Sequence, residues 1–219
     1  NPDIAVIGDF VGAAGRSSAG DPAATFALHE AEASFQAAVD PYARADFFFS
    51  FSPEGVEVEE GFITFPTLPG KLLLKAGKLR AGFGKVNTMH VHSLPWVDRP
   101  LITKNLLGGE EGFSDAGLSL ARLIPLGSTF LEATAEVYRG DSELFKAPRR
   151  QDLAYGARLR GYRDLSESSN LDVGASFASG HNGELADSRT QLFGVDATFR
   201  YRPLRRAIYR RFLLRSELV

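Results

Sequence analysis

The chain has 219 residues, a formal net charge of −2 and no cysteine. The nearly balanced charge argues against a nucleic-acid binder with a broad basic surface, and the lack of cysteine excludes disulfides and thiolate metal sites. No apolar run approaches the roughly 18 residues of a membrane-spanning helix, so a helical membrane protein is excluded.

Residues 42–52 show the dominant pattern of the chain, an alternation of apolar and polar residues with a period of two. One row consists of Ala43, Ala45 and three phenylalanines, and the other row carries Arg44 and Asp46. This alternation is typical of a β-strand with one apolar and one polar face. It recurs along the first half of the chain, where the predicted strands are 4–12, 25–39, 42–52, 56–67 and 71–84. In the last of these, Leu79, Ala81 and Phe83 form the expected apolar row.

The second half of the chain repeats the pattern, with turn residues between the alternating segments. Most of the predicted strands are longer than the five or six residues usual in soluble proteins, and they suit the 9–11 residues of a tilted membrane-spanning strand. The predicted strands are 116–124, 129–140, 151–164, 171–180, 191–202 and 208–219, which brings the total to about eleven.

Short turns on one side and longer loops on the other favour an outer-membrane barrel over a soluble barrel or sandwich. The apolar rows are rich in Ala, Phe and Leu, whereas the inner rows of a sandwich are usually rich in Val, Ile and Leu. We therefore predict an all-β fold, an antiparallel transmembrane β-barrel that forms a single domain over residues 1–219. The apolar rows are expected to face lipid and the polar rows a watery interior.

The polar rows supply the candidate pore-lining residues. These are Arg44, Asp46, Glu30, Glu32, Lys78, Arg80, Glu132, Glu136, Arg158, Arg160, Arg200 and Arg202. The first 64 residues contain 2 basic and 11 acidic residues, whereas residues 65–219 contain 23 basic and 16 acidic residues. The sequence therefore predicts an early acidic arc and a late basic arc of the wall.

The segment 85–114 is too long for a simple connection, so it is expected to have a function. One interpretation is a constriction loop that folds into the lumen, with His90, His92, Arg99 and Lys104 as its candidate functional residues. The alternative is a loop that packs over the barrel rim.

His90 and His92 form the one pattern that suggests a metal site. Two imidazoles at this spacing suit Zn²⁺ if a carboxylate completes the site, and the sequence offers Asp98, Glu110 or Glu111. Two polar loop residues facing water are the more economical interpretation, so no metal and no cofactor are predicted. Paired carboxylates such as Glu57 and Glu59 are interpreted as wall residues, and no catalytic residue or enzymatic activity is predicted.

Two stretches, "KAGKLRAGFGKVN" and "LPWVDRPLITKNLLGGEEGFSDAGLSL", resemble bacterial outer-membrane porins of the phosphate-selective porin O and P family and related uncharacterised barrels. The resemblance implies a wide, water-filled barrel that is usually trimeric. The lysine-rich loop and the arginine ladder of the phosphate channels are not recognisable here, so phosphate does not follow as the solute.

An odd strand count and the lack of a terminal aromatic residue suggest a barrel that is incomplete at the C-terminus. The alternative is a miscount within the irregular region 56–67. The predicted function is an outer-membrane channel of a Gram-negative-type bacterium for passive diffusion of small hydrophilic or ionic solutes, with outer-membrane lipid as its surroundings. A non-conducting barrel that serves as a structural or interaction partner, and a soluble β protein that binds an apolar ligand, remain alternatives.

Overall fold

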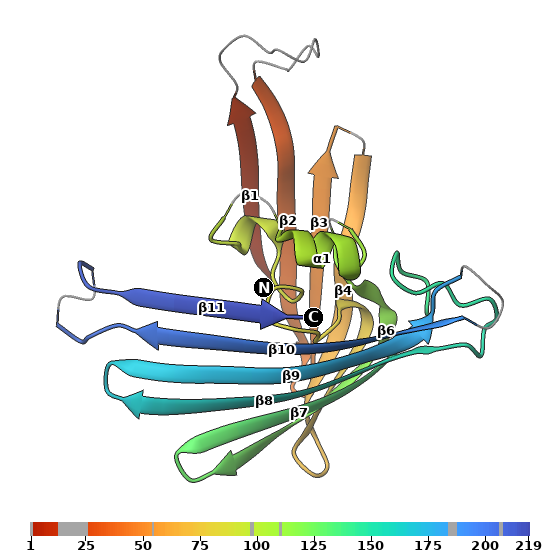
Figure 1. Ribbon diagram of the computed structural model, residues 1–219. Coiled ribbons are helices and arrows are strands. Elements are labelled where there is room, and N and C mark those ends of the chain that lie inside the picture. Colours follow the sequence, from red (N-terminus) through yellow and green to blue (C-terminus); the bar gives the residue numbers. More distant parts are fainter. Residues whose placement is uncertain are drawn as a thin grey trace.

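A computed structural model describes residues 2–12, 26–53, 55–96, 99–109, 111–183, 188–205 and 208–219. In this part of the chain eleven antiparallel strands form one sheet, and each strand pairs with its neighbours in sequence (Figure 1). The predicted all-β antiparallel architecture is confirmed. The sheet is not closed, because β1 and β11 form its two edges.

The strand bounds follow the sequence pattern closely. The strands are β1 (Asp3–Gly12), β2 (Phe26–Asp40), β3 (Ala43–Ser52), β4 (Gly55–Leu68), β5 (Leu72–Arg80), β6 (Ser114–Leu126), β7 (Thr129–Tyr138), β8 (Ala154–Ser166), β9 (Ser169–His181), β10 (Arg189–Tyr201) and β11 (Phe212–Leu218). Two short helices, η1 (Val91–Ser93) and α1 (Leu101–Leu106), lie between β5 and β6.

Each predicted strand has one counterpart in the structure, and the irregular region 56–67 forms the single strand β4. The clearest difference is that β5 ends at Arg80 and not at Gly84. The N–H of Ala81 donates to the carbonyl of Phe113, so the segment that leaves β5 is tied to the segment that enters β6. β11 also begins later than predicted, at Phe212.

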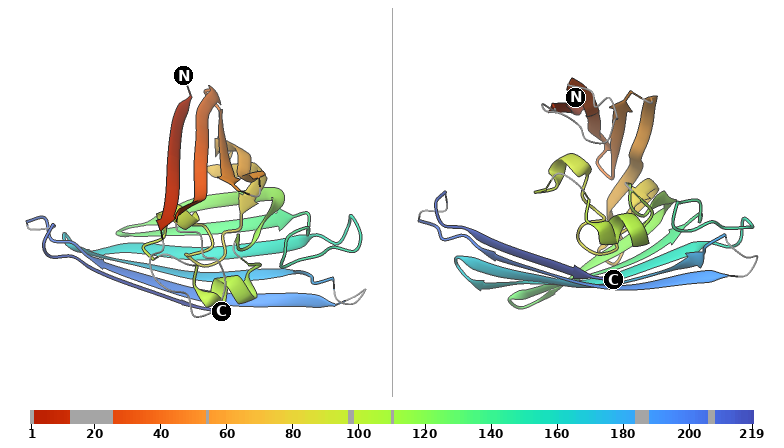
Figure 2. Two further views of the ribbon diagram at one scale, coloured as in Figure 1. Left: turned by 90° about the horizontal axis from the view of Figure 1, so that it is seen from above. Right: turned by 45° about the horizontal axis from the view of Figure 1, so that its top comes forward.

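The sheet curls around the segment 81–113. Strands β6–β11 form a broad curved layer, β1–β4 rise away from it, and α1 lies between these two portions (Figures 1 and 2). The face of the sheet that contacts the segment 81–113 is called the inner face below, and the opposite face is called the outer face.

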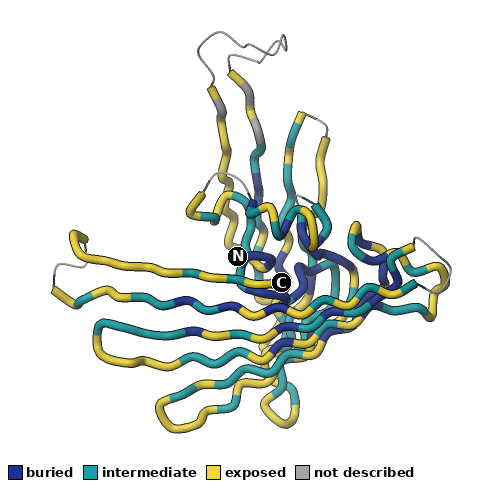
Figure 3. The backbone as a smooth tube through the Cα atoms, in the orientation of Figure 1, coloured by how far each residue is buried: buried dark blue, intermediate teal, exposed yellow. Residues whose placement is uncertain are grey.

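The inner face is polar and the outer face is apolar. Buried inner-face side chains include Glu32, Asp46, Ser119, Glu136, Arg158, Asp172, Ser176, Asp196 and Thr198. Exposed outer-face side chains include Phe47, Ile63, Leu118, Leu159, Val173, Phe193 and Val195. Burial is concentrated where the sheet meets the segment 81–113 (Figure 3). The described side chains of β1 and the first three residues of β11, 212–214, are exposed.

A small apolar cluster occupies part of the inner side. It contains Leu79, Ala81 and Phe83 together with Phe62, Leu107, Phe113, Tyr138, Phe145, Ala154 and Ala178. The sequence pattern predicted that Leu79, Ala81 and Phe83 would face lipid, and that prediction is wrong because all three are buried in this cluster. In the β5–β6 ladder Leu79 pairs with Asp115 and Lys75 pairs with Ser119, so Leu79 and Lys75 lie on the same face. This is the inner face, because Ser119 donates to the inner-face residue Glu136. Beyond Arg80 the strand has ended, so alternation no longer sets the direction of Ala81 and Phe83.

Candidate functional site

Strand register explains how two adjacent glutamates reach the inner face. The β3–β4 ladder pairs Phe48 with Glu60 and Phe49 with Val58, so Glu59 is the extra residue of a β-bulge. A bulge breaks the strict alternation of side chains and redirects the inserted residue. As a result both Glu59 and Glu60 contact His90 of the segment 81–113.

These glutamates belong to a cluster that joins three parts of the chain. His90 Nδ1 lies 3.0 Å from Glu59 Oε2 and 3.2 Å from Glu32 Oε2, and His90 Nε2 lies 2.8 Å from Glu60 Oε2. His92 Nδ1 lies 3.0 Å from Glu32 Oε2. The residues Glu32, Glu59, Glu60, His90 and His92 are called the histidine–glutamate cluster below.

The cluster strongly affects the imidazole at its centre. Burial alone lowers the pKa of His90, but the hydrogen bonds that its ring donates to Glu32, Glu59 and Glu60 outweigh burial and raise the pKa to about 11. When both ring nitrogens face carboxylates, both donate hydrogen bonds if the ring is an imidazolium. Phe48 covers the ring with its centroid 4.8 Å away, which limits access of water.

Arg80 lies at the edge of this cluster, at the point where β4 and β5 diverge. Its Nη2 lies 2.6 Å from Glu59 Oε2, its Nη1 donates to the carbonyl of Glu111, and its backbone N–H donates to Glu60. Lys78 lies 3.4 Å from the carboxylate of Glu57. Lys78 and Arg80 are on the row of β5 opposite to Leu79, and they reach these partners because the sheet bends between β4 and β5.

The segment 81–113 is attached to the inner face by backbone N–H groups that donate to wall side chains. Gly82 N donates to Glu136 Oε2 (2.9 Å), and Gly84 N donates to Ser176 Oγ (3.0 Å). Lys85 N and Val86 N both donate to Glu217 Oε2, at 2.9 and 3.1 Å. These bonds hold the start of the segment against β7, β9 and β11, and an ionised carboxylate such as that of Glu217 is a stronger acceptor than the hydroxyl of Ser176.

The later wall arginines are matched by aspartates. Arg158 Nη2 lies 2.7 Å from Asp196 Oδ2, and Arg160 forms two hydrogen bonds with Asp172. Arg158 and Asp172 are buried, so the two pairs are shielded from solvent more than exposed pairs would be. The predicted basic arc is therefore partly neutralised within β8–β10.

The other candidate residues lie at several places. Glu30, Arg44, Glu132, Glu136 and Arg200 are on inner-face rows of their strands, and Arg44 bonds Asp46 at 2.9 Å. Arg202 lies just past the end of β10, where its N–H donates to Ser168. Arg99 is buried and donates to the carbonyl of Met89, and Lys104 is in the last turn of α1.

The carboxylates that contact His90 and His92 are not those predicted from the sequence. Of the three that the sequence offered, Asp98 and Glu110 lie outside the described residues, and Glu111 contacts Lys78 instead. The carboxylates that do accompany the histidines come from β2 and β4. The "EE" pair at 59–60 was a visible signal, because two adjacent glutamates break strict alternation.

Comparisons with known proteins add one relative. No protein-family model matches the chain. An uncharacterised protein of Aquifex aeolicus (strain VF5) is 31% identical over 199 residues, which are 80% of this chain and 42% of the relative. The chain thus spans less than half the length of that relative. No helix in the described residues is long and apolar enough to cross a membrane.

Proposed function

We propose that this chain forms part of the wall of an outer-membrane β-barrel in a Gram-negative-type bacterium. The barrel is a channel for passive diffusion of small hydrophilic or ionic solutes. The observation that carries the proposal is the distribution of side chains between the two faces of the sheet. Outer-face residues such as Phe193 and Val195 are 67% and 55% exposed, while inner-face Asp172 and Thr198 are 1% exposed. A soluble protein buries its apolar face, so the reverse arrangement suits a sheet surrounded by lipid.

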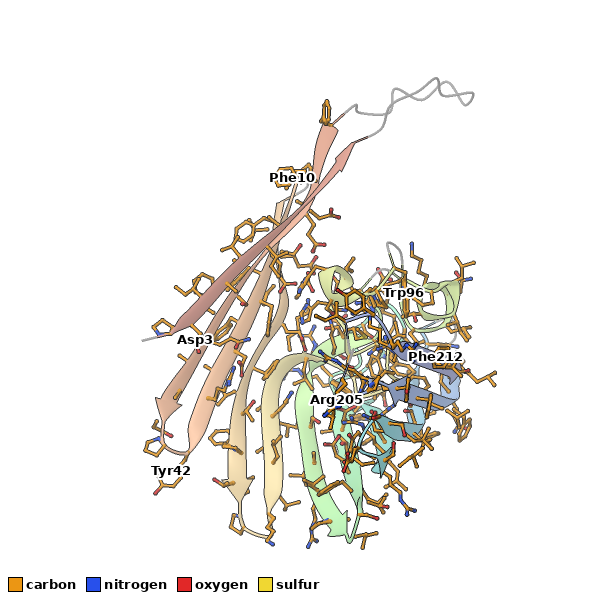
Figure 4. All side chains as sticks on the ribbon, turned by 90° about the vertical axis from the view of Figure 1, so that its left-hand side faces the viewer. Asp3, Phe10, Tyr42, Trp96, Arg205 and Phe212 are labelled. Atoms are coloured by element: carbon orange, nitrogen blue, oxygen red, sulfur yellow. The ribbon has the colours of Figure 1, made fainter. Side chains whose placement is uncertain are left out.

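Strand length and strand ends support the same proposal. Most strands have 9 to 15 residues, enough for a tilted strand to span the hydrocarbon region. Exposed tyrosines lie near strand ends, as Tyr155 in β8, Tyr201 in β10 and Tyr42 in the β2–β3 turn do. Tyr42 lies at the opposite end of the β1–β2 hairpin from Phe10 (Figure 4). Aromatic side chains at both ends are typical of the two interfacial girdles of a barrel.

Closure of the barrel requires additional strands. β1 and β11 each have one paired edge in the described sheet, and an open edge cannot be placed in lipid without unsatisfied backbone groups. We propose that strands outside this sheet complete the barrel, and that the assembly is a homo-oligomer, a trimer by the resemblance to the phosphate-selective porins.

Membrane assembly tests the proposal at Val195, which is at the middle of β10. In the barrel completed by the additional strands, Val195→Arg should prevent insertion into lipid vesicles, because arginine at the bilayer midplane costs about 2–4 kcal/mol. Val195→Leu is the matched control and should insert as the wild type does. Insertion is measured by protection of the chain from protease after folding into vesicles. A wild-type chain that is soluble and monodisperse without detergent would contradict the proposal.

A non-conducting barrel is the second candidate, and the apolar cluster favours it. Leu107, Phe113 and Phe145 are fully buried on the inner side, so the segment 81–113 is packed against the wall. A fully plugged lumen would conduct no ions.

Conductance of the reconstituted protein decides between the two candidates. Replacing residues 91–105 with a short Gly/Ser linker retains Asn87, Leu107 and Phe113, which hold the rest of the segment. If the protein is a channel, the wild type should conduct ions and the variant should have a higher conductance. If both proteins are silent in planar bilayers although they insert, the non-conducting barrel is the correct function.

A further inference from the structure

The histidine–glutamate cluster has the composition of a transition-metal site. It offers two imidazoles and several carboxylates, and zinc and related divalent ions bind these ligand types. We propose that His90 Nδ1, His92 Nδ1 and the carboxylates of Glu32 and Glu59 bind one divalent transition-metal ion such as Zn²⁺. The ion would join the segment 81–113 to β2 and β4. This inference concerns binding and does not depend on conduction through the channel.

Three of the four proposed ligand residues already lie close enough to one another to share one small ion. Four atoms at about 2.0–2.2 Å from a tetrahedral ion lie about 3.3–3.6 Å from each other. In the structure Glu32 Oε2 lies 3.2 Å from His90 Nδ1 and 3.0 Å from His92 Nδ1, and Glu59 Oε2 lies 3.0 Å from His90 Nδ1. One ligand atom from each of Glu32, Glu59 and His90 lies within 4.8 Å of the others. His92 is not in this group of three, although its Nδ1 adjoins Glu32, so its side chain has to move toward Glu59 and His90 when the ion binds.

The surroundings of these ligands are an independent observation in favour of a metal. Metal-binding histidines commonly donate the far ring N–H to a carboxylate, and the carboxylate ligands are hydrogen-bonded in turn. Glu60 lies 2.8 Å from His90 Nε2, on the side of the ring away from Glu32 and Glu59. Arg80 donates to Glu59 at 2.6 Å. Glu60 thus orients the ring of His90, and Arg80 orients the carboxylate of Glu59 through Oε2, the oxygen that also faces His90 Nδ1.

The charge of the site also favours a divalent cation. Glu30 is hydrogen-bonded to Glu59, which brings a fourth carboxyl group to Glu32, Glu59 and Glu60. Arg80 is the permanently charged partner that contacts this group. In the described structure these four carboxyl groups outnumber the one guanidinium that contacts them. A divalent ion would remove this excess.

An open pocket gives an ion access to the site. A volume of about 500 Å³ next to the cluster is lined by residues of β1, β2 and the segment 81–113, including Asp9, Glu30, His92 and Trp96. A smaller adjoining pocket is lined by Ile7, Asp9, Glu30, Glu32 and His92. Carboxylates along this path attract cations toward His92.

Metal titration of the chain folded in detergent tests the inference. After treatment with a chelator, the wild type should bind one Zn²⁺ per chain by calorimetry, and Co²⁺ should give the visible absorption of a tetrahedral site. Loss of an outer-shell partner alone weakens binding about 10–100-fold, so His90→Ala/His92→Ala should weaken it by at least about 10-fold. Glu132→Gln removes an inner-face carboxylate elsewhere on the wall and should bind as the wild type does.

The outcomes separate a metal ion from a proton. Absence of Zn²⁺ binding, or equal affinity in the wild type and the double variant, would overturn the inference and leave His90 as an imidazolium held by carboxylates. If the double variant does not fold, X-ray absorption of the Zn²⁺-loaded wild type decides. Two imidazoles in the coordination shell support the site, and a shell without imidazole overturns it. Because the readout is binding, a failure of conduction does not affect this result.

Discussion

At the scale of single residues, Asn87 holds the two ends of the segment 81–113 together. The side chain is fully buried. Its amide group donates to the carbonyls of Ala81 (2.8 Å) and Phe113 (2.9 Å), and its oxygen accepts from the N–H of Phe113 (2.8 Å). One side chain thus satisfies backbone groups at both ends of the segment 81–113. Ala81 and Phe113 lie outside β5 and β6, so strand pairing does not satisfy all of these groups.

Asn87→Ala should therefore be strongly destabilising. It removes the partner of the Ala81 carbonyl and of the Phe113 N–H, at about 1–3 kcal/mol each, so the free energy of unfolding should fall by about 2–5 kcal/mol. Thr88→Ala is the neighbouring control, because its hydroxyl is exposed and the change should stay within about 0.5 kcal/mol. Urea unfolding in detergent micelles, followed by far-UV circular dichroism, measures both. Equal stability of the two variants would show that Asn87 does not hold the segment.

At the scale of the elements, the bend between β4 and β5 depends on a close approach of two backbones at Gly77. The residue has a φ of +145°, and a Cβ there would lie 2.2 Å from the carbonyl oxygen of Gly61. The bend directs Lys78 and Arg80 toward Glu57 and Glu59, so the histidine–glutamate cluster depends on it.

Gly77→Ala should disrupt this bend, and Gly55→Ala provides a matched control. Gly55 has nearly the same φ, +146°, but nothing lies within 4 Å of a Cβ at that position. Backbone strain of about 1–3 kcal/mol is expected in both variants, whereas the collision with Gly61 is added only at Gly77. Urea unfolding should show a clearly larger loss of stability for Gly77→Ala. Equal losses would mean that the backbones separate at little cost.

At the scale of the whole molecule, the distribution of charge differs from what the sequence suggests. The first 64 residues are strongly acidic and the remainder is basic. The structure pairs Arg158 with Asp196 and Arg160 with Asp172, so the later part of the wall has a weaker positive field than the sequence analysis predicted. Glu30 and Glu32 belong to the acidic part of the inner face, where Glu32 contacts two histidines and no arginine or lysine in the described structure.

Ion selectivity should therefore depend on the acidic arc more than on the paired arginines. In a reconstituted channel, Glu30→Gln/Glu32→Gln should shift the reversal potential in a KCl gradient toward anions. Arg158→Gln/Asp196→Asn removes a charge pair with no net change and should leave the potential nearly unchanged. The recordings include a chelator, so that a bound metal does not contribute. A larger shift in the second variant would contradict the proposed distribution of the field.

Periodicity along the chain was enough to predict the strands and, for most of them, which residues share a face. Alternation is a local property of neighbouring residues, so the row of Arg44 and Asp46 and the opposing row of phenylalanines predicted β3 without knowledge of its partners. The same reasoning located the eleven strands and singled out the segment between β5 and β6. It failed at Leu79, which the β5–β6 register places on the inner face. It also failed at Ala81 and Phe83, because a strand that ends at Arg80 leaves no alternation to follow.

Which side chains contact one another depends on how the strands pair and how the sheet curves in the folded molecule. Whether Glu59 joins Glu60 on the inner face depends on a bulge, which is a relation between β3 and β4 and is not a property of either strand alone. The partners of His90 lie 58, 31 and 30 positions away in the chain, at Glu32, Glu59 and Glu60. Such contacts arise when the sheet curls around the segment 81–113, and periodicity within one strand contains no information about them.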